Sequence, residues 1–341
     1  NVELRGQGGW SSKRFGAQNF YSSLYPDQQE YTRTLIGALE LKHRGLWSWS
    51  IRSYFRQHND RFELFREDDD HYRFANGYFI RNGTDTARFS PSFFYTYHNM
   101  HRTRVFGTEA EVHRAWRAGT SALGVHLRDE GIVSNVLGEP LATSMHAPGA
   151  RDPYTRKGGR RNMALHVDHR YTWKRIMLDA GVLLNLNTAF SSTWVPGLDL
   201  SFGWNDQHTT YASVARAFRL PTYTDLYYNR GGAVGSLDLR PEHGDQVEVG
   251  HRIRVGRWSG SVSAFARQGH DLIDWVKLSG EQVVRAANIT SLAIIGAELS
   301  ARWTAADEKS TAGGSYAHLS ADRTTFDFTS LYVLDHLRHR L

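Results

Sequence analysis

The stretch 162–187, NMALHVDHRYTWKRIMLDAGVLLNLN, alternates apolar and polar residues on both sides of a short polar break. Before the break, Met163 and Leu165 lie on the face opposite to His166. After the break, one face carries Ile176, Leu178, Ala180, Val182, Leu184 and Leu186. A period of two is typical of β-strands, whereas a helix needs a period near 3.6. The stretch therefore predicts two antiparallel strands joined by a turn near 173–175.

The same alternation recurs along the chain in segments of about ten residues, the length of a tilted strand that crosses a bilayer. Short and long connections alternate through about fourteen such strands, as in outer-membrane barrels with periplasmic turns and extracellular loops. The short connections are expected near 43–46, 114–118, 173–175, 205–208, 256–258 and 305–309. The long ones are expected near 11–33, 56–102, 129–161, 187–197, 219–246, 267–291 and 320–332. The fold class predicted is all-β, a transmembrane antiparallel β-barrel.

Composition is compatible with this class and excludes others. The 341 residues are 40% hydrophobic, and no apolar run approaches the roughly 20 residues of a membrane-spanning helix. Hydropathy alone leaves a secreted or cytosolic all-β protein as the alternative. The net charge of +6 is scattered without a basic block, which argues against a nucleic-acid partner. The absence of Cys excludes disulfides and thiolate metal sites.

Tryptophans and charged residues fall where a barrel needs them. Rings beside short connections predict an aromatic girdle at the headgroup level, and they are Trp47, Trp49, Trp116, Trp173, Trp204, Trp258 and Trp303. The polar face predicts a wet lumen lined by Arg52, Tyr54, Arg56, Glu109, Glu111, His166, Asp168, Glu248, Arg252, Arg254, Glu298 and Arg302. An open sheet edge is unfavourable in lipid, so sequence missing at both ends is expected.

The segment 218–242, FRLPTYTDLYYNRGGAVGSLDLRPE, is loop-like, rich in tyrosine and flanked by strands. With its surroundings it resembles the barrel domain of TonB-dependent outer-membrane receptors. The residues that carry the resemblance occur in the family's order: Phe218, Arg219, Pro221, Asp225, Leu226, Tyr227, Leu239, Pro241, Glu242, Glu248, Gly250, the stretch LIDW (272–275), Asn288, Gly296 and Glu298.

The N-terminal half, with FGAQNFYSSLYPDQQEYTRT and SIRSYFRQHNDRFEL, looks like the cobalamin receptors (BtuB-type) of Bacteroidetes. The resemblance implies that 1–341 is part of a barrel of roughly 22 strands, without the N-terminal plug, the TonB-contacting box and the last strands. It implies import of cobalamin or related corrinoids across the bacterial outer membrane, energised by TonB. The implied partners are TonB, the lipid bilayer with its lipopolysaccharide, and a surface lipoprotein. A haem or ferric-siderophore receptor is the alternative.

A large ligand with a polar rim suits a mouth of rigid amphipathic rings, because Tyr offers area and a hydrogen bond. The residues expected to contact ligand are Tyr21, Tyr25, Tyr54, His58, Tyr223, Tyr227, Tyr228 and Asn229. The alternative role for each is packing of its loop onto the barrel.

Metal sites and catalysis have weaker support. Calcium binding is expected only at Asp68 and Asp70 of EDDDHY (67–72), where a solvated acidic loop is the alternative. His166 with Asp168, His336 with His339, and His98 with His101, are weighed as metal or haem ligands, against lumen lining.

An outer-membrane hydrolase needs a nucleophile and oxyanion donors, and nothing supplies these beside His58 and Asp60. The chain is therefore not expected to be an enzyme and needs no resident cofactor. A purely structural or adhesive barrel, with no small ligand, is the remaining class.

Overall fold

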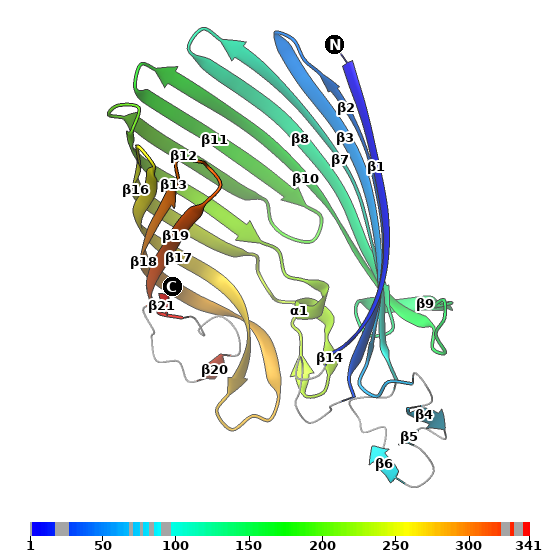
Figure 1. Cartoon of the computed structure of the whole chain (residues 1–341). Helices are drawn as coiled ribbons and strands as arrows, with labels where there is room; N and C mark the ends of the chain where they lie inside the picture. Colours follow the sequence, from blue (N-terminus) through cyan, green and yellow to red (C-terminus); the bar gives the residue numbers. More distant parts are fainter. Residues whose placement is uncertain are drawn as a thin grey trace.

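The computed structural model describes residues 2–17, 27–67, 71–75, 78–81, 85–89, 97–321, 328–330 and 337–341. Its main feature is one tall, curved, antiparallel wall (Figure 1). The long strands are β1 (Val2–Gly16), β2 (Gln29–His43), β3 (Trp47–Glu63), β7 (Asn99–Trp116), β8 (Gly119–Ser134), β10 (Tyr154–Trp173), β11 (Ile176–Asn187), β12 (Thr193–Gly203), β13 (His208–Arg219), β16 (Glu242–Val255), β17 (Trp258–Leu278), β18 (Val284–Thr304) and β19 (Thr311–Ala321).

The remaining elements belong to the connections. They are β4 (Arg73–Ala75), β5 (Tyr78–Arg81), β6 (Asp85–Phe89), β9 (Glu139–Met145), α1 (Tyr223–Tyr227), β14 (Asn229–Arg230), β15 (Ala233–Val234), β20 (Phe328–Ser330) and β21 (His339–Arg340). β4, β5 and β6 form a small separate sheet within the connection between β3 and β7. The short helix α1 is the one helix of the described chain, and no described helix could cross a membrane.

Each long strand pairs antiparallel with the next long strand along the wall. Within the described residues β1 pairs only with β2, and the far side of the wall ends at β19 and the short β21. The all-β prediction is therefore confirmed, and the wall is an open sheet of the kind that part of a larger barrel presents.

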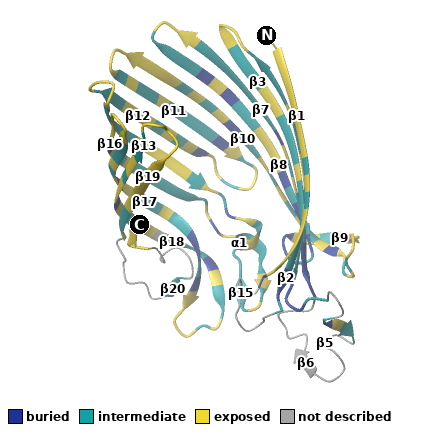
Figure 2. Ribbon diagram, in the orientation of Figure 1, coloured by how far each residue is buried: buried dark blue, intermediate teal, exposed yellow. Residues whose placement is uncertain are grey.

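One face of the wall is apolar, as the alternation in the sequence predicts. A single register row crosses eight neighbouring strands through Leu4, Leu41, Ile51, Ala110, Val125, Leu165, Leu184 and Trp194. The side chains of this row are exposed or half-exposed, with 70% of Leu4 and 58% of Trp194 accessible. Little of the wall is buried by the chain itself (Figure 2). Contiguous exposed apolar surface of this extent marks a face covered by lipid.

The opposite face is polar. The neighbouring row passes through Arg5, Glu40, Arg52, Glu109 and His126, so that charges of opposite sign face one another across strands. His126 Nε2 lies 3.6 Å from Glu109 Oε1. Helix α1 lies on the side toward which the wall curves (Figure 1), and its loop contacts this polar face. The polar face is therefore the inner one, as expected for a wet lumen.

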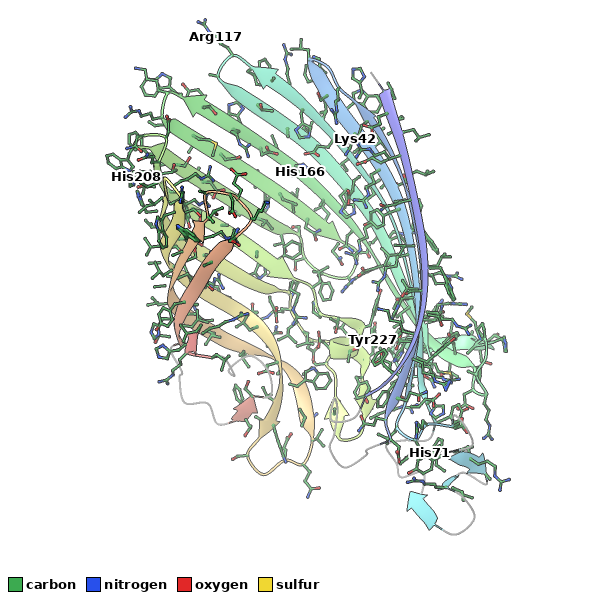
Figure 3. All side chains as sticks on the ribbon, in the orientation of Figure 1. Lys42, His71, Arg117, His166, His208 and Tyr227 are labelled. Carbon is green, nitrogen blue, oxygen red and sulfur yellow. The ribbon has the colours of Figure 1, made fainter. Side chains whose placement is uncertain are left out.

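The connections confirm the predicted asymmetry. Short turns at 44–46, 117–118, 174–175, 204–207, 256–257 and 305–310 lie at one end of the wall, and the elaborate connections lie at the other. Figure 3 shows Arg117 and His208 at the turn end, with Tyr227 and His71 at the loop end. The exposed rings beside the turns include Trp47, Trp116, Trp173, Trp204 and Trp258, each 49–59% accessible.

Two predicted long loops are wrong. The sequence suggested long connections over 187–197 and 267–291, but β11 and β12 are joined by 188–192 alone, and β17 and β18 continue as a hairpin whose turn is only 279–283. The polar residues that suggested a loop remain in register, since His270 pairs with Ser291 and Leu272 with Ile289, although Asp271 has φ 53°. The ladder therefore continues through this polar stretch, which is why the local composition was misleading.

Candidate functional site

The loop 220–241 begins with a network of charged and capping groups. Arg219 makes a bidentate ion pair with Glu242, with both N–O distances at 2.7 Å, across the β13–β16 pair. Asp225, which is buried, accepts hydrogen bonds from the Thr222 backbone N–H (2.9 Å) and hydroxyl (2.8 Å). Asp225 also lies 3.5 Å from Arg219. Helix α1 is therefore held at a fixed position against the end of β13.

The end of the loop is held by an amide. Asn288 on β18 accepts a hydrogen bond from the Arg240 N–H (2.9 Å) and donates to the Arg240 carbonyl (3.0 Å). Its side chain also donates to the carbonyl of Asp271 on β17 (2.5 Å). Leu239 is buried against Ile273 in the adjoining cluster. Hydrogen bonds, ion pairs and packing thus hold both ends of the loop in place. The motif residues that make these contacts therefore have a structural role.

The motif residues fall into two groups. Those in or beside the loop are Phe218, Arg219, Pro221, Asp225, Leu226, Pro241, Glu242 and Asn288. Those on wall strands are Glu248, Gly250, Gly296 and Glu298. On β16, Glu248 accepts a hydrogen bond from the Tyr211 hydroxyl (2.8 Å), and the Tyr211 ring lies over Gly250. A Cβ at Gly250 would lie 2.4 Å from Tyr211 Cζ, so only glycine fits beneath this ring.

The loop folds inward onto β8 and β10. Arg160 donates from Nη1 to the Pro221 carbonyl (2.7 Å), and the Tyr223 hydroxyl donates to the Glu130 carbonyl (3.3 Å). The Tyr223 ring lies over Gly158, where a Cβ would meet the ring at 3.0 Å. Burial raises the pKa of Tyr223 to about 12, so its hydroxyl stays protonated and can donate at neutral pH.

A buried carboxylate lies beneath this contact. Glu130 is 7% exposed and forms ion pairs with both Arg128 (2.5 Å) and Arg160. The two cations come from β8 itself and from β10, so Glu130 links the strands that support the loop. Removing the carboxylate would leave two neighbouring guanidinium groups without their shared partner.

The remaining loop candidates lie together near α1. Burial raises the pKa of both Tyr227 and Tyr228, and the Tyr228 ring meets Trp275 edge-on at 6.3 Å. Asn229 is exposed at the start of the β14–β15 hairpin. Tyr223, Tyr227 and Tyr228 pack against a buried wall cluster of Ile132, Val136 and Leu137. The structure therefore brings these three rings together, each half-buried against the wall.

Two further candidates lie on β3, apart from this group. Tyr54 lies over Gly107, and its hydroxyl is 2.8 Å from His126 Nε2. His58 is on the same inner face, with Nδ1 2.8 Å from the Thr34 hydroxyl. Four residues along a strand span about 13 Å, so the two side chains line different heights of the lumen.

Comparison with known proteins decides the family. The model described as "TonB dependent receptor-like, beta-barrel" matches residues 3–335 of the chain. The chain belongs to the TonB-dependent receptors. This family resides in the bacterial outer membrane.

Sequence and structure relatives agree on the family and differ in their ligands. The vitamin B12 transporter BtuB of Vibrio vulnificus (strain YJ016) is 28% identical over 142 residues, which are 41% of this chain and 22% of the relative. The siderophore receptor PirA of Pseudomonas aeruginosa superposes with a TM-score of 0.68 at 14% identity, over 94% of this chain and 54% of that structure. The FrpB iron transporter of Neisseria meningitidis superposes with a TM-score of 0.63 at 14% identity, over 94% of this chain and 48% of that structure.

Structural similarity at this identity establishes the fold alone. The TonB-dependent receptor chain spans about half the length of the solved structures it matches. An open sheet, rather than a closed barrel, agrees with a chain of about half the length of those structures.

The loop end of the receptor contains a histidine that the sequence suggested as a metal or haem ligand. His98 is fully buried, and its Nε2 lies 2.9 Å from Glu67 and 4.0 Å from Glu63. The Tyr97 ring packs on it, tilted, with centroids 4.4 Å apart, and the Tyr97 hydroxyl donates a hydrogen bond to the same Glu67 carboxylate (3.1 Å). The hydrogen bond from His98 lowers the pKa of Glu67. In this setting His98 acts as a packing residue of the loop core.

The other suggested ligands are also paired. His101 Nδ1 lies 2.7 Å from the Ser134 hydroxyl, and His166 Nε2 lies 3.4 Å from Glu111 across the lumen face. Across the ranges that the structure describes, no three His, Cys, Asp or Glu side chains converge as a metal site. His339 packs on His318 at 4.8 Å, whereas His336 lies outside the described residues.

Several predictions concern residues that the structure does not describe. Tyr21, Tyr25, Asp68 and Asp70 lie outside the described ranges, so ligand contact by the tyrosines and calcium binding by the aspartates stay predictions. The pair considered for hydrolysis does not meet: His58 bonds to Thr34, and Asp60 lies 4.0 Å from His101. The Glu130 network was not predicted, because its members come from two strands and nothing local indicates their proximity.

Proposed function

We propose that this chain is the barrel wall of an outer-membrane receptor that binds cobalamin or a related corrinoid at its loop end and imports it with energy from TonB. The observation that carries the proposal is the similarity to the vitamin B12 transporter BtuB over 142 residues. The half-buried tyrosines of the loop 220–241 support it, because flat rings with hydroxyl groups suit a large planar ligand with polar edges.

The proposal assigns a distinct task to each part. Tyr227, Tyr228 and Asn229 contact the ligand, and the fastened ends of the loop keep these side chains in place before ligand arrives. A preorganised rim loses little conformational entropy on binding, which favours affinity for a scarce ligand. The wall carries out no covalent chemistry. TonB acts through a region outside 1–341, and a surface lipoprotein over the loop end is a further proposed partner.

A receptor for haem or a ferric siderophore is the second candidate. The solved structures that the wall matches include receptors described as siderophore receptors, and their identity of 14–16% leaves the ligand open. The inner face also carries cations, among them Arg128 and Arg160, that suit an anionic iron chelate.

Parallel calorimetric titration of the purified full-length receptor with cyanocobalamin, haem and ferric enterobactin distinguishes these candidates. The proposal expects saturable binding of cyanocobalamin and much weaker binding of the two iron compounds. Tight binding of an iron compound without cobalamin binding would overturn it in favour of the second candidate. No saturable binding of any of the three would favour a structural barrel.

The rim assignment is tested by the double variant Tyr227→Ala/Tyr228→Ala. Loss of two stacking rings is expected to weaken cyanocobalamin binding by about tenfold or more. Tyr171→Ala is the matched control, because Tyr171 is an exposed ring on the outer face beside the short turn 174–175. Unchanged affinity in the double variant would show that these rings only pack the loop.

A further inference from the structure

Two histidines meet on the outer face of the wall at its turn end. His208 begins β13 directly after the turn 204–207, and His251 lies on the adjoining strand β16. Ile253, the register partner of His208, is an exposed apolar residue of the same face. The two imidazole rings are tilted with centroids 5.5 Å apart, and His208 Nδ1 lies 3.2 Å from His251 Nε2. Figure 3 shows His208 at the turn end, so the pair is remote from the loop 220–241.

The ring of His251 is oriented through its other nitrogen. Its Nδ1 lies 2.9 Å from the hydroxyl of Thr210, its register partner on β13, and this hydroxyl accepts a hydrogen bond from Trp204 Nε1 (2.9 Å). In the tautomer that donates Nδ1–H to Thr210, Nε2 presents its lone pair to His208. Metal-ligating histidines are oriented in this way, by a partner on the nitrogen that does not bind the metal.

The position of His208 is fixed by the turn that precedes it. Its backbone N–H donates to the Asn205 side chain (2.9 Å), and its carbonyl accepts a hydrogen bond from the Trp204 N–H (2.9 Å). In its Nε2–H tautomer, Nδ1 faces His251 with a lone pair, so two lone pairs converge within 3.2 Å. One shared cation stabilises such a pair. That cation is either a proton, as in an N–H···N hydrogen bond, or a metal ion.

The separation of the two nitrogens suits a single metal ion. Two nitrogens at about 2.0 Å from one ion lie roughly 2.8 Å apart at a right angle and roughly 3.3 Å apart at a tetrahedral angle. The observed 3.2 Å lies within this interval, and both rings are half-buried. Among the described residues no third His, Cys, Asp or Glu side chain converges on the pair. Water or a donor from another molecule therefore completes the coordination, as in open metal sites.

A second position at the turn end shows which part of this arrangement is unusual. Trp116 Nε1 donates to the Ser121 hydroxyl (2.9 Å), and this hydroxyl lies 2.8 Å from Nδ1 of His169, its register partner on β10. The unit repeats the arrangement of indole, hydroxyl and imidazole described above, but Gly119 stands two residues before the hydroxyl. The aromatic girdle therefore contains this unit without a second imidazole, and His208 is the additional feature.

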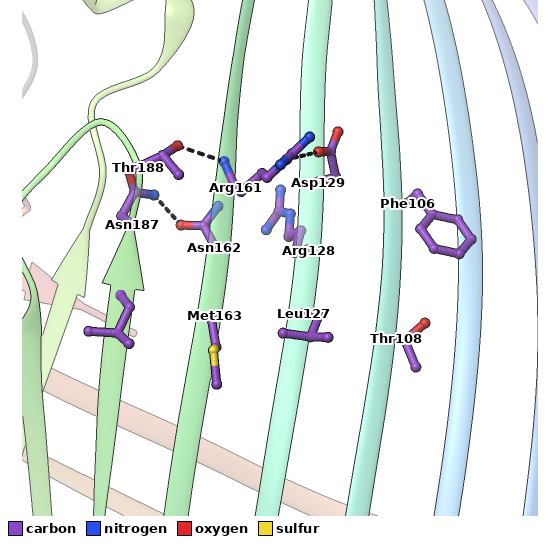
Figure 4. Close-up of a pocket in the computed structure, with 11 residues that line it drawn as sticks. Phe106, Thr108, Leu127, Arg128, Asp129, Arg161, Asn162, Met163, Asn187 and Thr188 are labelled. Atoms are coloured by element: carbon purple, nitrogen blue, oxygen red, sulfur yellow. Dashed lines mark hydrogen bonds and ion pairs between the residues drawn. The ribbon is translucent and has the colours of Figure 1, made fainter.

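The apolar pocket of the same face lacks such donors. This pocket, of about 580 Å³, is lined by Phe106, Leu127 and Met163 (Figure 4). Its charged groups Asp129 and Arg161 pair with each other (2.9 Å), and no histidine occurs among the described residues that line it. Two nitrogen donors that face one point thus distinguish the histidine pair from its surroundings.

We propose that His208 and His251 chelate a divalent ion of a late first-row transition metal, with Cu²⁺ bound most tightly. Imidazole nitrogens suit Cu²⁺, Ni²⁺ and Zn²⁺, and the affinity of a nitrogen site for divalent ions is highest for Cu²⁺. Hard cations such as Mg²⁺ prefer oxygen ligands and do not suit this donor set. The site lies at the opposite end of the wall from the proposed ligand rim, so it goes beyond the import function and is independent of the cargo.

Calorimetric titration of the full-length receptor, purified without a polyhistidine tag and stripped of metal, measures the binding of Cu²⁺, Zn²⁺ and Mg²⁺. The variants His208→Gln and His251→Gln each remove one ligand. Thr210→Val removes only the orienting hydroxyl. His169→Gln is the matched control, because His169 has the same kind of hydroxyl partner on the outer face. Heat-modifiable electrophoretic mobility shows that each barrel is folded.

The native receptor and His169→Gln are expected to bind Cu²⁺ with equal affinity, Zn²⁺ more weakly and Mg²⁺ not at all. Loss of an orienting partner costs at least about tenfold in metal affinity, so Thr210→Val is expected to bind Cu²⁺ about tenfold more weakly. Loss of a ligand costs more, so His208→Gln and His251→Gln are each expected to bind Cu²⁺ about 100-fold more weakly.

Electron paramagnetic resonance of the native receptor with one equivalent of Cu²⁺ tests the site without any variant. The spectrum is expected to show coupling of the copper electron spin to the nitrogens of two imidazoles. Coupling to fewer than two imidazoles would overturn the proposal, because the neighbouring rings would then share only a proton. Cu²⁺ affinity that is unchanged in either ligand variant, or that is reduced as much by His169→Gln, would also overturn it.

Discussion

The two faces of the wall follow different rules. On the outer face, neighbouring strands present one apolar side chain after another, as in the row from Leu4 to Trp194. On the inner face, specific partners meet, as in the pairs Glu109–His126 and Glu111–His166. Lipid accepts any apolar side chain of suitable size, whereas the polar inner face depends on matched neighbours. The outer face therefore tolerates changes of shape but not of polarity, whereas the inner face tolerates a new charge but not a change of shape where side chains are packed.

The largest effect is expected from a charge in the middle of the outer face. Leu165→Lys places an ammonium group in the centre of the apolar row and is expected to reduce the free energy of unfolding by about 2–4 kcal/mol. Guanidinium unfolding of the full-length receptor in phospholipid vesicles measures this. The matched control is His166→Lys, the next residue on the same strand, which faces the lumen beside Glu111. An equal loss for both variants would break the distinction between the faces.

A change of shape on the inner face tests the other half of the comparison. Gly250→Ala adds a methyl group 2.4 Å from the Tyr211 ring and is expected to reduce the free energy of unfolding by about 1–3 kcal/mol, because the ring must move. Gly244→Ala on the same strand meets nothing within 4 Å and is expected to change it by less than about 0.5 kcal/mol. The same unfolding assay applies, and similar values for the two variants would contradict the packing argument.

The smallest effect, absent at neutral pH, is expected from ionisation of the half-buried Tyr223 in the loop 220–241. The pKa of Tyr223 is raised to about 12, from about 10 for the unfolded chain. A raised pKa means that the folded state favours the neutral phenol, so its contribution is complete below pH about 10 and is lost as pH rises through about 12. Limited proteolysis of the loop 220–241 across this range is expected to accelerate in the native receptor.

The matched variant for this titration is Tyr223→Phe. It removes the ionisable group and retains the ring, so its loop is expected to resist proteolysis over the same pH range. Because Tyr223 is largely protonated at pH 11, the phenolate absorbance of the variant at that pH is expected to be only slightly lower than that of the native receptor. The difference should be less than the signal of one ionised tyrosine. A loop that opens equally in both proteins would show that another group controls the transition.

Much of the fold could be predicted because it depends on local alternation. The faces of β10 and β11, the short turns and the elaborate loop end all follow from period-two patterns and from the spacing of polar breaks. The extent of β17 and β18 could not be predicted, because the polar residues around Asp271 look like a loop and are kept in the ladder by pairing with the partner strand.

The site was less accessible to sequence reasoning. The loop 220–241 was found through its tyrosines and its motif, yet the role of Asn288 depends on a partner 48 residues away. The Glu130 pairs and the burial of His98 arise from contacts between distant segments. No local pattern in the sequence indicates contacts of this kind.

Glycines beneath rings recur on the inner face and have a consequence for its contour. The rings of Tyr54, His166, Tyr211 and Phe265 each lie over the glycine paired with them on the next strand, at Gly107, Gly124, Gly250 and Gly296. Each ring rests flat where a side chain would otherwise stand upright. The inner face therefore projects less at these points than it would with an upright side chain. A methyl group added at any of the four glycines would lift its ring away from the wall, so the contour of the inner surface depends on the absence of four side chains as much as on the rings themselves.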